Sequence, residues 1–233
     1  MLPYFYIQNF DRAQQSIVLD EDNSRHAVQV LRMKAGAALH LTDGKGHLIK
    51  AVITNDHKKH CEVAVQDVSW SARPEPSVII AIAPTKNSSR MEWLLEKAAE
   101  MGVQEVIPLL TRRTERQRFK AERMRNILIS AMLQSQQTWL LHMPAAMDFD
   151  KLMVDAKYET VPNKYMAHCV ETDKQALSRS STSSIILIGP EGDFTTEEIR
   201  AALEKGYQPV TLGETRLRTE TAGMVAAALL KIG

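Results

Sequence analysis

Cysteine is nearly absent from the 233-residue sequence, in which Cys61 and Cys169 lie far apart and neither belongs to a CxxC motif. They provide no disulfide framework, so we expect a cytoplasmic protein in a reducing compartment. Long apolar runs are also lacking: residues 222–232, the longest candidate, fall far short of the roughly 20 residues that cross a bilayer. The N-terminus has no basic leader and no small-residue cleavage site. We therefore expect neither a membrane span nor a signal peptide.

An excess of charge of one sign is missing too, because 29 Lys and Arg residues face 28 Asp and Glu residues. With 44% hydrophobic residues, this balance excludes a disordered chain and, taken alone, argues against a nucleic-acid binder. Residues 112–125 differ, since they include seven basic and two acidic residues. Such a run is usually a solvated face, but this one is one-sided and follows a strand. We predict that it contacts nucleic-acid phosphates.

Residues 1–70 have the pattern of a small β-barrel. Short apolar or alternating runs are separated by turn residues and by one helix, predicted over residues 25–32 with Ser24 as its cap. Pro74 and Pro76 then mark residues 71–76 as a linker. The predicted strands cover residues 4–7, 16–19, 38–42, 48–54 and 62–68.

Residues 77–233 alternate between strands and helices, which predicts an α/β domain with helices on both faces of a mostly parallel sheet. Capping boxes at Ser89–Glu92 and Thr195–Glu198 mark two helix starts. The predicted strands cover residues 78–83, 103–110, 165–170, 184–189 and 209–212, and other helices cover 119–136, 148–156 and 221–232.

The strongest local motif is Ile188-Gly189-Pro190-Glu191-Gly192, at the carboxyl end of a predicted buried strand. Ligands of open α/β sheets bind at this edge, where glycines allow the backbone to approach a ligand closely. The motif is more elaborate than a strand-to-helix turn requires. It therefore favours a ligand site over a plain turn.

A second motif follows the next strand, where Leu212-Gly213 leads to the start of the last helix. Arg216, Arg218 and Glu220 surround that helix start, which is more charge than capping alone needs. This arrangement also favours a site. The small residues after it, 222–228, are as typical of a core helix as of a close contact with a second subunit.

Weaker motifs have ordinary interpretations. Gly44-Lys45-Gly46 lies between two strands of the predicted barrel and is interpreted as a hairpin turn. His57, His60 and His168 lack zinc-site spacing, so we expect solvated histidines and no metal. No Ser or Cys lies in a nucleophile elbow, which removes the main hydrolase hypothesis.

Together, the two glycine motifs and Leu217-Arg218-Thr219-Glu220-Thr221-Ala222 resemble the signature of the RsmE family. These enzymes are 16S ribosomal RNA uridine-N3 methyltransferases of the SPOUT superfamily. The resemblance covers nearly the whole chain, since residues 26–32, 43–44, 86–92 and 96–103 also match family positions in the expected order.

The resemblance implies a PUA-like, RNA-binding β-barrel followed by a SPOUT domain whose C-terminal segment forms a deep trefoil knot. It also implies S-adenosyl-L-methionine as cofactor, a homodimer, and 16S rRNA or the small ribosomal subunit as partner. Arg25, Arg32, Arg112, Arg113, Arg116 and Arg118 would grip RNA phosphates. The implied cofactor-binding residues are Leu187, Ile188, Gly189, Pro190, Glu191, Gly192, Leu212, Gly213, Leu217, Arg218 and Thr219.

The chain departs from the family pattern in two places. Where the family often has Glu-Gln-Ser-Gly-Arg, this chain has Leu133-Gln-Ser-Gln136-Gln137, and Asp193 replaces a common Gly. The first change affects RNA contacts or the subunit interface. The second is the milder change, and neither alters the implied cofactor loops.

The expected chemistry assigns three catalytic candidates. Uracil N3 must lose its proton, so a cation near the uracil oxygens stabilises the negative charge, a role for which we predict Arg218. Glu191 and Glu220 are alternative bases, or they hold the loops by hydrogen bonds. Two other hypotheses remain open: a SPOUT enzyme with a different target, such as a ribose 2′-hydroxyl or a transfer RNA base, and a non-catalytic RNA-binding protein.

Overall fold

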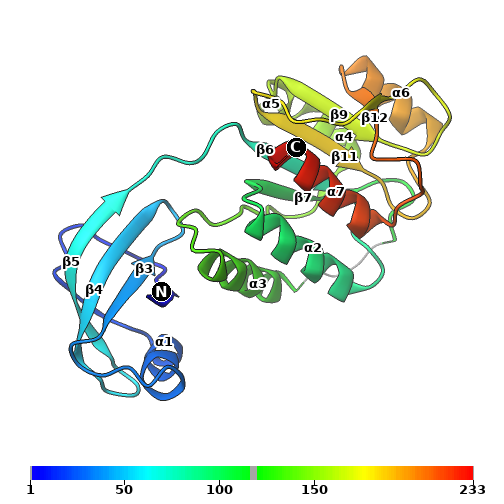
Figure 1. Ribbon diagram of the computed structural model, residues 1–233. Coiled ribbons are helices and arrows are strands. Elements are labelled where there is room, and N and C mark those ends of the chain that lie inside the picture. Colours follow the sequence, from blue (N-terminus) through cyan, green and yellow to red (C-terminus); the bar gives the residue numbers. More distant parts are fainter. Residues whose placement is uncertain (1, 116–119, 233) are drawn as a thin grey trace. The chain divides into compact units, whose positions relative to one another are not determined.

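The structure is a computed structural model that describes residues 2–115 and 120–232, and it divides into two compact units (Figure 1). The N-terminal unit consists of Met1–Arg73 together with Met132–Leu140. The C-terminal unit consists of Pro74–Ala131 and Leu141–Gly233. The hydrophobic pattern does not reveal that Met132–Leu140 joins the N-terminal unit, because its first residues continue a helix of the other unit.

The N-terminal unit is built on one five-stranded sheet with the order β1-β3-β4-β5-β2. The β1–β3 pair is parallel and the other pairs are antiparallel. Among the described residues β1 and β2 form the two edges of the sheet, so the unit is an open half-barrel and the expected β-barrel is confirmed only in part. The strands are β1 (Tyr4–Tyr6), β2 (Ser16–Val18), β3 (Ala38–Thr42), β4 (His47–Asn55) and β5 (Glu62–Trp70).

The helical insertion of this unit begins earlier than predicted, with α1 (Glu21–Arg25) followed by a π-helical turn, η1 (His26–Val30). Asp20 is the N-cap, and its carboxylate accepts from the Asn23 amide at 2.8 Å. Ser24 is not the cap. Its buried hydroxyl donates to the Leu19 carbonyl and accepts from the Cys61 amide, which joins the helix to the sheet.

Residues 138–140 are built into the N-terminal unit at the turn between β3 and β4. The Gly46 amide donates to the Thr138 carbonyl, and the Leu140 amide donates to the Gly44 carbonyl, both at 2.9 Å. A Cβ on Gly46 would lie 2.8 Å from the Trp139 ring, so only glycine fits there. The Gly44–Gly46 segment is a hairpin turn, as predicted, and it also holds this returning segment.

The C-terminal unit contains a seven-stranded, wholly parallel sheet with the order β10-β12-β9-β11-β6-β7-β8. The expected α/β architecture is therefore confirmed. Its elements are β6 (Val78–Ile82), α2 (Ser88–Glu100), β7 (Glu105–Leu110), α3 (Ala121–Gln134), β8 (Met147–Asp148), α4 (Phe149–Val154), α5 (Ala156–Glu159), β9 (Asn163–Ala167), β10 (Gln175–Ala176), β11 (Ser184–Ile188), α6 (Thr196–Glu204), β12 (Gln208–Thr211) and α7 (Thr219–Lys231).

Both faces of this sheet are buried, which explains why β6 and β11 are continuous apolar runs. Helices α2 and α7 lie side by side on one face, and α7 also packs on β6 and β11 (Figure 1). On the other face, Ile79, Ala81, Ile185 and Leu187 join a core with the buried residues of α4 and α6. The carboxyl ends of the strands are left for the loops.

Two helix starts test the predicted capping boxes. Thr195 caps α6 as predicted: its amide donates to Glu198 Oε2 at 2.8 Å, and its hydroxyl accepts from the Glu198 amide. The box at Ser89 is wrong, because Asn87 caps α2 and Glu92 instead pairs with Arg123. Within the described residues, no helix is long and apolar enough to cross a membrane.

Candidate functional site

A cavity of about 750 Å³ lies at the carboxyl ends of β9, β11 and β12. Its wall comes from the loops after these three neighbouring strands and from the first turn of α7. Ligand cavities commonly have volumes of roughly 300–1,000 Å³ and occur at this edge of a parallel sheet. The lining residues are 167–169, 174, 188–191, 193, 210–219 and 222.

The loop after β11 has a backbone that packing holds in place. A Cβ on Gly189 would lie 3.0 Å from the ring of Phe194, which is itself buried, so a side chain here would require that ring to move by a few tenths of an ångström. Asp193 has φ 62°, a left-handed conformation that is uncommon outside glycine. Its carboxylate accepts from the Cys169 amide at 2.8 Å. The loop is thereby joined to the chain that follows β9.

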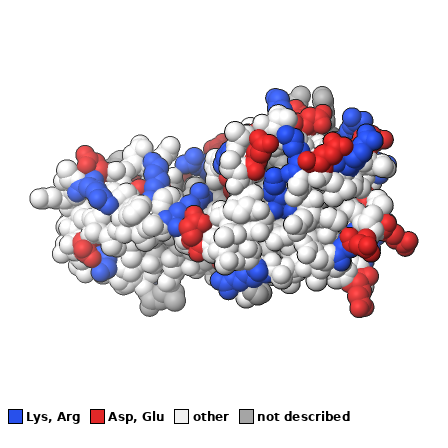
Figure 2. All heavy atoms as spheres, turned by 90° about the horizontal axis from the view of Figure 1, so that it is seen from above, with Lys and Arg blue, Asp and Glu red and all other residues white. Residues whose placement is uncertain are grey.

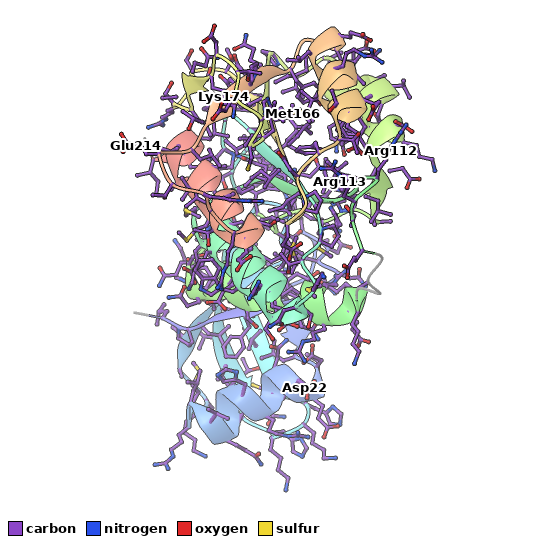
Figure 3. The ribbon with its side chains drawn as sticks, turned by 90° about the vertical axis from the view of Figure 1, so that its right-hand side faces the viewer. Asp22, Arg112, Arg113, Met166, Lys174 and Glu214 are labelled. Atoms are coloured by element: carbon purple, nitrogen blue, oxygen red, sulfur yellow. The ribbon has the colours of Figure 1, made fainter. Side chains whose placement is uncertain are left out.

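The start of the basic run supports this loop from outside the cavity. Arg113 Nη1 donates to the Gly192 carbonyl at 2.6 Å and to the Phe194 carbonyl at 3.4 Å. The Arg112 amide donates to Glu198 Oε1 at 2.8 Å. Figure 3 shows both arginines at the loops of the C-terminal unit. Arg113 is exposed, and it also stabilises the loop after β11 by these two hydrogen bonds.

The loop between β12 and α7 is bonded to the first loop at two points. Arg216 donates to the Glu191 carbonyl at 3.3 Å, and the buried Thr219 hydroxyl donates to the Gly189 carbonyl at 3.2 Å. Gly213 has φ 136°, a conformation that favours glycine. Both glycine motifs thus form one continuous wall, as their positions after strands predict.

The three residues predicted to be catalytic have different surroundings. Arg218 is the N-cap residue of α7 and lines the cavity, and its exposed guanidinium forms no hydrogen bond or ion pair with any described residue. Glu191 also lines the cavity and is exposed. Glu220 is buried outside the cavity wall, 3.5 Å from Arg90 Nε on α2. This geometry favours an anchoring role for Glu220.

Most of the predicted cofactor residues meet at this cavity. All of them except Leu187 and Gly192 line it. Leu187 belongs to the core on the far face of the sheet, because alternate residues of a strand point to opposite faces. Gly192 lies against Arg113, whose side chain covers the outside of the loop.

Several lining residues were missed, above all those that follow β9. The strand predicted at 165–170 ends at Ala167, so His168 and Cys169 lie at its carboxyl end and not within it. His168 is 8% exposed, and the expectation that it is solvated is wrong. Lys174, which is labelled in Figure 3, lies in the same loop. Its Nζ donates to the His168 carbonyl at 2.7 Å. The rule that ligands bind at strand ends would have found these residues had the strand boundary been correct.

Of the other residues predicted to bind RNA, two are exposed in the N-terminal unit and two lie outside the described residues. Arg25 pairs with Glu21 at 2.8 Å, and Arg32 is exposed with φ 56°. Arg116 and Arg118 lie outside the described residues. His57 and His60 are exposed and stacked, as expected for solvated rings.

Comparison with known proteins agrees with this architecture. Residues 73–231 match the family model of an RNA methyltransferase domain, and residues 19–66 match an RNA methyltransferase PUA domain. A probable rRNA-methyltransferase from Porphyromonas gingivalis is 40% identical over 97% of this chain and 95% of its own, with a TM-score of 0.89.

Two further relatives carry a more specific name. The ribosomal RNA small subunit methyltransferase E of Rickettsia conorii is 27% identical over 97% of this chain and 94% of its own length. The enzyme of the same name from Neisseria gonorrhoeae, solved with bound S-adenosylmethionine, is 26% identical with a TM-score of 0.81 and covers 98% of this chain and 96% of its own. The chain therefore belongs to the RNA methyltransferase family that includes ribosomal RNA small subunit methyltransferase E, the RsmE family.

Proposed function

We propose that this protein uses S-adenosyl-L-methionine to methylate N3 of a uridine in the 16S rRNA of the small ribosomal subunit. The observation that carries the proposal is the cavity formed by both glycine motifs at the carboxyl ends of β9, β11 and β12. Relatives that share this whole architecture are named as small-subunit rRNA methyltransferases, and one was solved with the cofactor.

The residues around the cavity fit this cofactor chemically. Ile188, Leu212 and Leu217 supply apolar surface for an adenine ring, while Glu191 and Glu214 supply carboxylates for a cationic ligand. When bound, the cofactor supplies an electrophilic methyl group on a sulfonium.

The residues at the cavity have separate roles in positioning the donor, stabilising charge and removing the proton. The bonded loops fix the position of a bound donor, and such alignment lowers the barrier of an in-line displacement. Arg218 presents a planar set of N–H donors for the uracil oxygens as N3 becomes negative. Glu191 is the better placed of the two candidate bases, because Glu220 lies outside the wall and pairs with Arg90.

The remaining features of the family are part of the same proposal. The segment from β12 to α7 would thread the trefoil knot, supported by its bonds to the Gly189 and Glu191 carbonyls. The PUA-like unit would bind RNA, with residues 71–76 as the linker to the SPOUT domain. A homodimer is supported by exposed apolar Trp93 on α2 and Ile232 beside α7. The two free cysteines, Cys61 and Cys169, support a cytoplasmic location.

RNA binding should depend on individual basic positions. Figure 2 shows basic and acidic side chains interspersed on the face that it presents. We expect Arg25, Arg32 and Arg112 to contact phosphates, each adding about one unit to the slope of log affinity against log salt. The measurement is RNA affinity from about 50 to 200 mM salt for the unaltered protein and for an Arg112→Ala variant. An identical slope for both would contradict a phosphate contact at Arg112.

The decisive experiment is methylation of small ribosomal subunits and of free 16S rRNA by the purified protein, read at single-base resolution. Methyl transfer to uracil N3 is the expected result. Modification of a ribose 2′-hydroxyl, or of transfer RNA in a parallel reaction, would assign a different target. Cofactor binding and RNA binding without any methyl transfer would indicate a non-catalytic RNA-binding protein.

A further inference from the structure

Near the turn between β3 and β4, a chain of hydrogen bonds in the N-terminal unit orients an arginine side chain. The buried Asp43 carboxylate lies 2.8 Å from His47 Nδ1, and Arg12 Nε donates to His47 Nε2 at 3.2 Å. Because an arginine side chain can only donate, His47 Nε2 is the acceptor and the proton of the ring is on Nδ1, which donates to Asp43. Phe10 contacts the same ring edge to face. Arg12 is therefore held through its Nε atom.

The terminal nitrogens of Arg12 are available to a ligand. Arg12 is exposed, and among residues 2–115 and 120–232 it forms no ion pair and no hydrogen bond other than the one to His47. The neighbouring Asp11 carboxylate accepts from the Ala13 amide at 2.9 Å and does not pair with Arg12. A guanidinium that is oriented but not neutralised suits a phosphate group, which accepts two parallel N–H bonds. Little of its freedom remains to be lost on binding.

An exposed indole lies beside this arginine. Trp70 on β5 is the antiparallel partner of His47 on β4, so their side chains are neighbours on one face of the sheet. Trp70 Nε1 donates to the Lys45 carbonyl at 3.0 Å, and the Trp139 ring contacts it edge to face. The indole is thus fixed in position, although Trp70 is 51% exposed. A fixed, open aromatic ring is the kind of surface on which a nucleic-acid base stacks.

Trp139 does not offer the same surface. A Cβ on Gly46 would lie 2.8 Å from its ring, and the Arg73 guanidinium carbon lies 5.7 Å from the ring centroid. Beside Trp70, in contrast, Lys45 has an exposed side chain that forms no ion pair within the described part of the chain. Trp70 therefore has a cation on either side and an open ring between them.

From this geometry we propose that Arg12, Lys45 and Trp70 bind one unpaired nucleotide of a single-stranded RNA. The base stacks on Trp70, and the Arg12 Nη atoms bond a phosphate of the same strand, with His47 and Asp43 as positioning residues. The inference rests on the proposed function, since it states which form of RNA the N-terminal unit binds and where. Arg12 and Trp70 both lie outside residues 19–66, the segment that matches the PUA domain model.

The first test is the affinity for a fluorescent single-stranded oligouridine of about ten nucleotides, measured by anisotropy. Trp70→Leu and Trp70→Phe both lose the Nε1 bond to Lys45, and only phenylalanine retains an aromatic face. We expect Trp70→Leu to weaken binding about fivefold to 100-fold and Trp70→Phe to stay within about threefold. Equal affinities of these two variants would overturn the inference, because the ring would then make no difference.

The second test concerns the phosphate contact. Arg12→Gln should weaken oligouridine binding about fivefold or more and lower the slope of log affinity against log salt by about one unit. Arg12→Lys should restore the slope without the full affinity, since it keeps the charge and loses the planar set of donors. Lys50→Gln is the matched control: it removes one charge from the opposite face of β4 and should change neither quantity.

A duplex of the same oligonucleotide separates stacking from general attraction to RNA. Bases in a duplex stack on each other, so Trp70→Leu should leave the affinity for the duplex unchanged. An equal loss for duplex and single strand would contradict the stacked base.

Methyl transfer to small ribosomal subunits, measured in parallel, distinguishes this inference from the proposed function. Transfer by the unaltered protein, combined with unchanged oligouridine affinity in Trp70→Leu and Arg12→Gln, would overturn the inference alone. The expected losses of affinity in a protein that transfers no methyl group would support the RNA site and overturn the proposed function.

Discussion

At the scale of single residues, Arg218 is exposed at the cavity and forms no ion pair with any described residue. It caps α7 through its backbone only, so its side chain is not needed to begin the helix. We expect Arg218→Ala to lower the rate of methyl transfer roughly 10²–10³-fold, the usual loss when one donor to a developing negative charge is removed. The measurements are kcat on small subunits and, separately, the affinity for S-adenosylmethionine.

Arg200, on the exposed side of α6, provides a matched control for this substitution. Arg200→Ala should leave both the rate and the cofactor affinity unchanged. If Arg218→Ala retains the full rate while it still binds the cofactor, Arg218 has no electrostatic role in the reaction.

Both departures from the family pattern occur where the backbone is left-handed. Gln136 has φ 56° and Asp193 has φ 62°, and the resemblance described above implies a glycine at both positions. The left-handed conformation costs a residue with a Cβ roughly 1–2 kcal/mol. At Asp193 a hydrogen bond from the Cys169 amide offsets part of this cost. The backbone at both positions is therefore left-handed although neither residue is a glycine.

Gln136 makes a direct test of that cost. We expect Gln136→Gly to raise the free energy of unfolding by up to about 1 kcal/mol, because glycine adopts positive φ without a Cβ penalty but has more conformational freedom in the unfolded chain. Chemical denaturation measures the change. Gln136→Ala removes the same side chain and keeps the Cβ, so it should give no gain; equal stabilisation by both variants would show that φ is not the cause.

At the scale of the elements, α7 approaches the sheet closely at one glycine. A Cβ on Gly223 would lie 2.8 Å from Ile82 Cδ1 and 3.0 Å from Leu94 Cδ1. The small residues predicted either for a core helix or for a subunit contact thus serve a core contact in this part of α7, between β6 and α2.

This close approach predicts the effect of one added methyl group. Gly223→Ala should lower the free energy of unfolding by about 1–3 kcal/mol, because overpacking outweighs the better helix propensity of alanine. Denaturant unfolding monitors the change. In an Ile82→Val background, which lacks the Cδ1 atom, the same substitution should cost clearly less. An undiminished cost there would place the strain elsewhere.

The hydrophobic periodicity of the sequence predicted most helices and strands, because both faces of the sheet are covered and must be apolar. The buried strands β6 and β11 are examples, since a short run rich in Ile between turn residues is typical of a buried strand. Helix starts were harder: Ser24 and Ser89 both have capping chemistry, but the nearby Asp20 and Asn87 have it too. Only tertiary contacts decide between neighbouring caps.

At the scale of the whole molecule, each unit contains a histidine whose pKa burial lowers. Burial and Lys50 lower the pKa of His40 in the N-terminal unit, and burial and Lys174 lower the pKa of His168 in the other. The unfolded chain, with an ordinary histidine pKa near 6.5, then binds more protons than the folded chain. Stability is therefore lost as the pH falls below about 6.5.

We expect the free energy of unfolding to decrease between about pH 6.5 and 5, above the range in which the carboxylates with lowered pKa, such as Glu92, are protonated. Denaturant titrations across this range measure the decrease. Replacing both histidines, by His40→Gln and His168→Gln, should flatten it. A slope unaffected by the double replacement would assign the pH dependence to other groups.

The sequence predicted those site residues that form local motifs. It did not predict the residues that reach the site only through the tertiary fold. Gly189, Gly213 and Arg218 can be recognised in the sequence, because tight turns and unpaired charges at strand ends are unusual. His168 and Lys174 come from a loop without a motif, and they reach the cavity only because β9 lies between β11 and β12 in the sheet. Strand order of this kind is a property of the fold and not of a local pattern.

The return of Met132–Leu140 to the N-terminal unit governs how this protein can be dissected. Neither unit is one continuous stretch of chain, so a single cut near residue 73 would separate Gly46 and Ser71 from the Thr138 and Trp139 groups that they bond. An excised N-terminal fragment would leave the Gly46 amide and the Ser71 carbonyl unpaired and would lose the Trp139 ring from its edge-to-face contact with Trp70. A faithful fragment needs residues 132–140 restored through a short artificial connection, and natural recombination faces the same obstacle when it exchanges one unit for another.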